Sequence, residues 1–96
     1  MATYDVADRS AIVTGAGAGI GREVALLLAR NGAHVVAQDI NADAAAAVVS
    51  EIEAAGGRAS AVVGDAGDEA VISEYIRAAQ ALGPFGIAIN NAGIGG

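Results

Sequence analysis

Short apolar runs alternate along this chain with longer segments in which apolar residues recur at helical spacing. The short runs cover residues 11–14, 33–38, 58–63 and 87–90, and the longer segments cover residues 19–31, 41–55 and 68–82. An unbroken apolar run indicates a strand buried on both faces, and parallel strands require a connection long enough to hold a helix. The alternation therefore predicts an α/β fold: a parallel sheet with right-handed connections and helices on both faces. We expect the strand order 3-2-1-4.

Composition narrows the classes of function. The 96 residues fit one domain, and the formal net charge of −6 argues against a nucleic-acid-binding surface, which needs cationic side chains for phosphates. The chain has no cysteine, and residues 1–10 are polar and acidic, unlike a signal peptide. No apolar stretch reaches the roughly 18 residues that a membrane span needs. We therefore expect a cytoplasmic protein that binds neither nucleic acid nor membranes.

A glycine-rich segment joins the first expected strand to the first expected helix. Glycines let the backbone turn sharply and approach a pyrophosphate without an intervening Cβ, and the N–H groups of the following helix then face the phosphate. The spacing, which begins at Thr14, is T-G-x-x-x-G-x-G rather than the common G-x-G-x-x-G. A flexible glycine–alanine turn is the alternative interpretation. The candidate phosphate-binding residues are Gly15, Gly17, Ala18, Gly19, Ile20 and Gly21.

Asp39 follows the second expected strand and is a candidate ribose-binding residue, together with its neighbour Ile40. A carboxylate in this place accepts hydrogen bonds from both hydroxyls of an adenosine ribose and repels a 2′-phosphate. No arginine occupies positions 16–18, and an apolar residue follows Asp39, so no cationic clamp for that phosphate is present. The sequence therefore favours NAD over NADP. The alternative is that Asp39 caps the second helix.

Two further polar motifs follow the third and fourth expected strands. Asp65 and Ala66 are candidates for adenine recognition, although Asp65 could equally cap the third helix. The fourth strand ends in Asn90, Asn91, Ala92 and Gly93, which suit either a tight turn or a backbone shelf beside a ribose. All of these motifs lie at the carboxyl ends of strands, where open α/β sheets bind ligands. The sequence predicts an incomplete, doubly wound Rossmann-type fold with one dinucleotide site at this edge.

Together these motifs resemble the short-chain dehydrogenase/reductase family, over essentially the whole chain. The resemblance implies an NAD(P)-dependent oxidoreductase that interconverts an alcohol and a ketone by hydride transfer, in a homo-oligomer. It implies that Asn91 and its neighbours border the adenosine half of the cofactor and that Asn90 helps to fix strand 4 to strand 5. Gly86 departs from the family, in which many members have an aspartate before the fourth strand, and we expect a looser turn there.

A larger departure concerns catalysis. Members of the family are longer and carry a serine and a Tyr-x-x-x-Lys motif in their second half, in which the tyrosine is the acid/base. All five basic residues of this chain are arginines, so this motif is absent. We therefore predict that residues 1–96 form one NAD-binding half-domain, the N-terminal part of a longer enzyme, with no catalytic residues of its own. The alternatives are a stand-alone dinucleotide-binding module and an interaction module that pairs through its fourth strand, whose residues 87–89 carry no charge.

The remaining polar and aromatic residues receive structural interpretations. His34 lies within the second strand and Tyr75 shares helical spacing with apolar neighbours, so we expect both to serve packing. The acidic pairs are expected on solvated helix faces, without the third ligand that would suggest a metal site. These pairs are Glu51 with Glu53 and Asp68 with Glu69.

Overall fold

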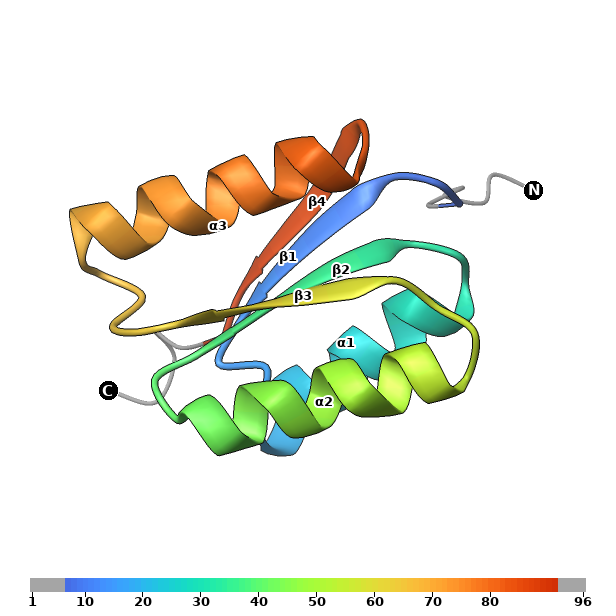
Figure 1. Cartoon of the computed structure of the whole chain (residues 1–96), viewed down its shortest axis with the longest axis horizontal. Helices are drawn as coiled ribbons and strands as arrows, with labels where there is room; N and C mark the ends of the chain where they lie inside the picture. The colour runs from blue at the N-terminus through green and yellow to red at the C-terminus, as the bar shows by residue number, and fades with distance from the viewer. Residues whose placement is uncertain (1–6, 92–96) are drawn as a thin grey trace.

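The computed structural model describes residues 7–91, which form four strands and three helices in strict alternation. In chain order they are β1 (Ser10–Thr14), α1 (Gly19–Arg30), β2 (His34–Asp39), α2 (Ala42–Ala54), β3 (Ala59–Val63), α3 (Glu69–Leu82) and β4 (Phe85–Asn90). The strands pair in parallel in the order β3-β2-β1-β4, as the sequence predicts (Figure 1). None of the helices within residues 7–91 is both long and apolar enough to span a bilayer.

The sheet divides the apolar core into two layers, one between each face and the helices that cover it. In Figure 1, α3 lies on one face of the sheet, and α1 and α2 lie on the other. The α1–α2 layer buries Val13, Val35 and Ile52, and the α3 layer buries Ile12 and Val36. Every residue of β1 is buried, because this strand lies inside the sheet and is covered on both faces. The unbroken apolar run at 11–14 is therefore correctly interpreted as a central strand.

Helical spacing identifies the buried face of α1 incompletely. The fully buried residues of this helix are Gly21 and Ala25, whose small size allows close approach to the sheet. Leu28 packs against the core from the edge. Ile20 and Leu27, which share the apolar spacing in the sequence, are 74% and 53% exposed. The apolar stripe of α1 is thus wider than the surface that the described residues cover.

A side chain caps the start of two of the helices. The side chain of Asn41 accepts a hydrogen bond from the Ala44 N–H at 3.0 Å at the start of α2. The side chain of Asp68 accepts from the Ala70 N–H at 2.8 Å at the start of α3, so Asp68 has a specific role beyond a solvated face. The first helix differs, because its N-cap residue, Ala18, offers no side-chain acceptor.

Gly86 lies within β4 and not in the turn before it, where we expected it from the family resemblance. The β1–β4 register shifts between Ser10 and Ala11, whose partners are Phe85 and Ile87, so Gly86 is the extra residue of a bulge. A Cβ at this position would lie 2.9 Å from the Cβ of Arg9. The lack of a side chain therefore serves close strand packing and does not loosen a turn.

The glycine-rich segment folds against the first turn of α1 at backbone distance. A Cβ on Gly21 would lie 2.0 Å from the carbonyl oxygen of Gly15. The side-chain amide of Asn91 donates a hydrogen bond to the same carbonyl oxygen at 3.3 Å. Gly21 thus leaves the space in which the end of β1, the start of α1 and the end of β4 meet.

We predict that Gly21→Ala destabilises the fold by about 3 kcal/mol, because the added methyl group meets backbone that cannot move aside. The measurement is the free energy of unfolding in denaturant. Gly67→Ala is the matched control: its Cβ would lie 3.5 Å from the nearest Asp65 oxygen, an ordinary contact, so its stability should stay within about 0.5 kcal/mol of wild type. Equal stability of the two variants would contradict the close approach at Gly21.

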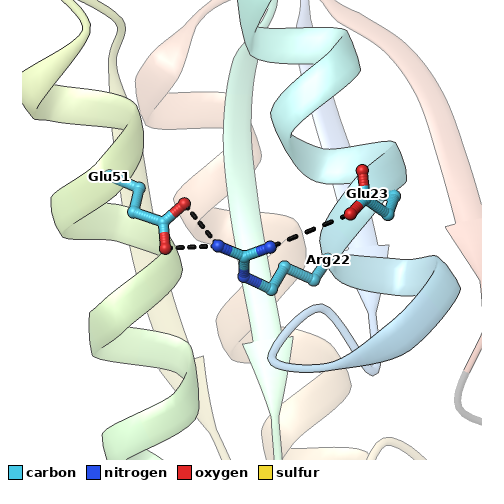
Figure 2. A network of polar contacts seen from close by, with 3 residues as sticks. All are labelled: Arg22, Glu23 and Glu51. Carbon is cyan, nitrogen blue, oxygen red and sulfur yellow. Dashed lines mark hydrogen bonds and ion pairs between the residues drawn. The ribbon is translucent and has the colours of Figure 1, made fainter.

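One ion pair links the two helices of the same layer. The Nη2 of Arg22 on α1 donates to both carboxylate oxygens of Glu51 on α2, and Glu23 lies 3.9 Å from Nη1 (Figure 2). The hydrogen bond and the charge of Glu51 raise the pKa of Arg22 above its ordinary value. Glu51 therefore lies on an exposed helix face, as expected, and in addition has a specific partner there.

We predict that Glu51→Gln lowers the thermal unfolding midpoint modestly, and that added salt shrinks the difference, because exposed ion pairs are screened. Because the pKa of Arg22 is raised, its guanidinium stays charged from neutral into alkaline solution, and only strongly alkaline solution removes the ion pair by neutralising it. Glu53→Gln, on the exposed side of the same helix, is the control and should leave the midpoint unchanged. A loss that does not depend on salt would contradict this interpretation.

Candidate functional site

A cavity of about 410 Å³ opens at the carboxyl ends of the strands, where the sequence places its polar motifs. Its lining residues are Gly15, Gln38, Asp39, Ile40, Gly64, Asp65, Ala66, Gly67 and Asn90. Six of these are candidates from the sequence: Gly15, Asp39, Ile40, Asp65, Ala66 and Asn90. The fold therefore brings together motifs that come from all four strand ends.

The glycine loop is held in place through its main chain. Gly15 adopts a left-handed conformation with φ 65°, which glycine adopts without strain. The Ala16 N–H donates to the carbonyl oxygen of Gln38 at 2.9 Å, and the Gly17 N–H donates to Oδ2 of Asp39 at 2.8 Å. A Cβ on Gly17 would lie 2.5 Å from the Cβ of Ala44, so this position too requires glycine.

The N-terminus of α1 is suited to an anion. No side chain caps Ala18, and the first turn contains no acidic residue, in contrast to α2 and α3. The N–H groups at the start of a helix have no partner within the helix, and the helix dipole places partial positive charge there. The predicted phosphate-binding segment therefore ends in N–H donors that side chains leave uncapped.

Asp39 connects the glycine loop to the start of α2. Its Oδ2 accepts from the Gly17 N–H, and its Oδ1 accepts from the Asn41 N–H at 2.9 Å. The N-cap of α2 is Asn41, so the capping alternative for Asp39 is wrong. Each oxygen of an ionised carboxylate has a second lone pair, so Asp39 retains acceptor capacity toward the cavity.

Asp65 orders the turn that follows β3. Its Oδ1 accepts from the Gly67 N–H at 2.9 Å, and its carbonyl oxygen accepts from the Asp68 N–H at 3.0 Å. The helix cap is Asp68, so the alternative that Asp65 caps α3 is also wrong. The side chain of Asp65 is exposed and lies in the cavity lining.

The two asparagines after β4 have different partners. Asn90 lies in the cavity lining, and its Oδ1 accepts from the Thr14 hydroxyl at 3.1 Å, which ties β4 to β1. The Asn91 amide donates to the Gly15 carbonyl oxygen, which ties the end of β4 to the glycine loop. Ala92 and Gly93, the other two predicted members of this motif, lie outside the described residues.

Part of the predicted phosphate segment lies apart from the cavity at the strand ends. Gly19 and Ile20 line a separate cavity of about 550 Å³ on the outer side of α1, next to Val24 and Leu27. Gly17, Ala18 and Gly21 line neither of these two cavities. The six-residue segment therefore serves partly as scaffold for the loop and partly as the surface of α1.

Sequence reasoning missed three residues of the cavity: Gln38, Gly64 and Gly67. Gln38 is fully buried, its Nε2 donates to the Gly64 carbonyl oxygen, and the Gly64 N–H donates to the Asp39 carbonyl oxygen at 3.0 Å. A glutamine within an otherwise apolar strand is the signal that could have found it, because buried polar side chains need partners.

The structural interpretations of His34 and Tyr75 are confirmed. The Nδ1 of His34 lies 2.8 Å from the Leu82 carbonyl oxygen, and only 15% of its side chain is exposed. Tyr75 packs against the α3 layer of the core. Residues 7–91 contain no group of three or more histidine, cysteine, aspartate or glutamate side chains that could hold a metal ion.

Comparison with curated proteins finds dehydrogenases. The 7alpha-hydroxysteroid dehydrogenase of Escherichia coli (strain K12) is 51% identical over 89 residues, which cover 92% of this chain and 35% of that protein. The cyclohexanol dehydrogenase of Acinetobacter sp. (strain SE19) is 43% identical over 88 residues, covering 91% and 35%. The chain thus spans about a third of the length of these relatives.

Solved structures and a family model agree with these relatives. A hydroxysteroid dehydrogenase from Escherichia coli superposes with a TM-score of 0.85 at 49% identity, covering 95% of this chain and 39% of that one. A 7 alpha-hydroxysteroid dehydrogenase complexed with NADH and 7-oxo glycochenodeoxycholic acid superposes with a TM-score of 0.80 at 46% identity, covering 86% and 33%. The family model for the short chain dehydrogenase matches residues 9–96. This chain, with its Rossmann-like sheet, therefore belongs to the short-chain dehydrogenase family.

Proposed function

We propose that this chain is the NAD-binding portion of an oxidoreductase that interconverts an alcohol and a ketone. The observation that carries the proposal is the contact between the Gly17 N–H and the Asp39 carboxylate, beside the uncapped N-terminus of α1. This contact joins the candidate phosphate-binding loop to Asp39, the candidate acceptor for ribose hydroxyls, at one edge of the sheet. NAD, when bound, supplies the hydride acceptor, and the residues described above bind and orient it.

The cavity supports an adenosine with free ribose hydroxyls. Among the described residues, those lining it include Asp39 and Asp65 and no arginine. A 2′-phosphate would bring negative charge toward Asp39 without a cation to match it. A relative of known structure is complexed with NADH, which is consistent with this choice of dinucleotide. We therefore propose NAD as the cofactor in preference to NADP.

We predict that Asp39→Ala weakens NAD binding by about 1–3 kcal/mol, roughly 5- to 150-fold, through the loss of hydrogen bonds to a charged group. NADP binding should fall much less, because the same change removes a repulsion. Isothermal titration calorimetry with both dinucleotides measures this.

The matched control is Asp43→Ala, which changes the charge equally in the first turn of α2 but lies outside the cavity lining. It should retain the wild-type affinity for NAD. Equal wild-type affinities for NAD and NADP, or unchanged NAD affinity in Asp39→Ala, would contradict the ribose assignment.

Hydride transfer needs groups that this chain does not carry. The family resemblance assigns acid/base catalysis to a Tyr-x-x-x-Lys motif and a serine, and no lysine is present in the 96 residues. We propose that an alcohol or ketone substrate binds only in a longer protein that contains these groups.

We predict that the 96-residue chain forms no NADH from NAD and cyclohexanol, because no tyrosine–lysine pair is available to accept the hydroxyl proton. The absorbance of NADH measures the reaction, and a full-length short-chain dehydrogenase that oxidises cyclohexanol serves as positive control. Turnover by the 96-residue chain would contradict the assignment.

The alternative functions are a stand-alone dinucleotide-binding module and a strand-pairing interaction module. The second has one specific observation in its favour: β4 is an edge strand of the described sheet, and Ala88 within it is exposed. An interaction module would have no reason to distinguish NAD from NADP, so the titrations separate it from the first proposal. A homo-oligomeric state and a cytoplasmic location remain predictions.

A further inference from the structure

Gln38 has an unused acceptor in the wall of the cavity. The side chain is fully buried, and its Nε2 donates to the Gly64 carbonyl oxygen. Its Oε1 has no hydrogen-bond partner among residues 7–91. A buried carbonyl oxygen without a partner is costly, so such atoms in folded proteins almost always meet a donor. The unpaired Oε1 of Gln38 therefore indicates a hydrogen-bond donor that does not belong to residues 7–91.

The position of Gln38 limits what that donor can be. On β2 it pairs in register with Thr14 of β1 and Val62 of β3, so it lies at the carboxyl edge of the sheet. It lines the same cavity as Asp39 and Asp65, the two candidate groups for an adenosine. A ligand that fills the cavity would therefore approach Gln38 along with both carboxylates.

We propose that Oε1 of Gln38 accepts a hydrogen bond from the exocyclic amine of an adenine base, which makes Gln38 a specificity-determining residue of the base pocket. This inference rests on the proposed dinucleotide function and adds a residue to it. The amine is the strong donor of adenine that lies away from the sugar, and it carries two hydrogens. Asp65, with one oxygen held by the Gly67 N–H, is a second acceptor in the same cavity.

The arrangement discriminates against an oxopurine. Hypoxanthine has a carbonyl oxygen where adenine has its amine, and that oxygen would face the oxygens of Gln38 and Asp65. The lining residues of the described chain include no cation to compensate. Because Gln38 has no exposed surface, direct contact requires the turn at Gly64, to which its amide is bonded, to shift slightly.

The test compares NAD with nicotinamide hypoxanthine dinucleotide by calorimetry. We expect the wild-type chain to bind NAD more tightly, and Gln38→Met, which keeps length but removes both polar groups, to lower this preference about fivefold, the value of one hydrogen bond. Asp39→Ala is the control: it weakens both dinucleotides equally and leaves the preference unchanged. The thermal midpoint of Gln38→Met reports any loss of fold.

A second measurement needs no variant. In ¹⁵N-labelled protein, the side-chain amide signals of Gln38 and Gln80 are the two glutamine signals, and Gln80 is exposed on α3. NAD should shift the Gln38 signal more than the hypoxanthine dinucleotide does, while Gln80 stays unchanged as an internal reference.

Three outcomes would overturn the inference: unchanged affinities for both dinucleotides in Gln38→Met, an equal loss of affinity for both, or equal shifts of the Gln38 signal with both. The second outcome would mean that Gln38 acts only by holding Gly64, and the third that an ordered water is its partner. If neither dinucleotide binds the wild-type chain, the proposed function itself fails, and the result is distinct from these.

Discussion

The close approach between Gly15 and Gly21 is the constraint on which the rest of the edge depends. The space that a side chain on Gly21 would occupy is filled by the carbonyl oxygen of Gly15, 2.0 Å from the Cβ position. This approach fixes where α1 starts relative to the end of β1, and hence where its free N–H groups lie. It also places the Gly15 carbonyl oxygen within reach of Asn91 and the Gly17 N–H within reach of Asp39. The absence of a side chain at Gly21 therefore permits the packing in which the start of α1, Asn91 and Asp39 meet the glycine loop.

The polar residues at this edge hold the main chain and line the cavity at once. Asp39 binds two N–H groups, and Asp65 orders its own turn, yet both remain in the cavity lining. For these residues, a structural role and a ligand-binding role are not alternatives. A carboxylate held by backbone N–H groups is already oriented, so less ordering remains to be done when a ligand binds.

The fold follows from local patterns, whereas parts of the site do not. Short apolar runs and helical spacing place all seven elements, because these signals act over a few residues. The partner of Glu51 is different: Arg22 lies on another helix, and only the packing of α1 against α2 brings the two together. The bulge at Gly86 depends in the same way on the β1–β4 register. The role of Gln38 needs both neighbouring strands to be in place, so its sequence position gives only a hint.

The placement of charge explains how an acidic chain can present a site for an anion. Arg22 is the basic residue nearest the glycine loop in sequence, and its guanidinium is engaged by Glu51 and lies near Glu23. The negative charge of a pyrophosphate would therefore be met by backbone N–H groups and the α1 dipole rather than by a basic side chain. Such donors are fixed by the fold and carry no net charge. Under the proposed function, Asp39 would then disfavour a dinucleotide with an additional phosphate, because the residues within 7–91 that line the cavity include no cation to offset its charge.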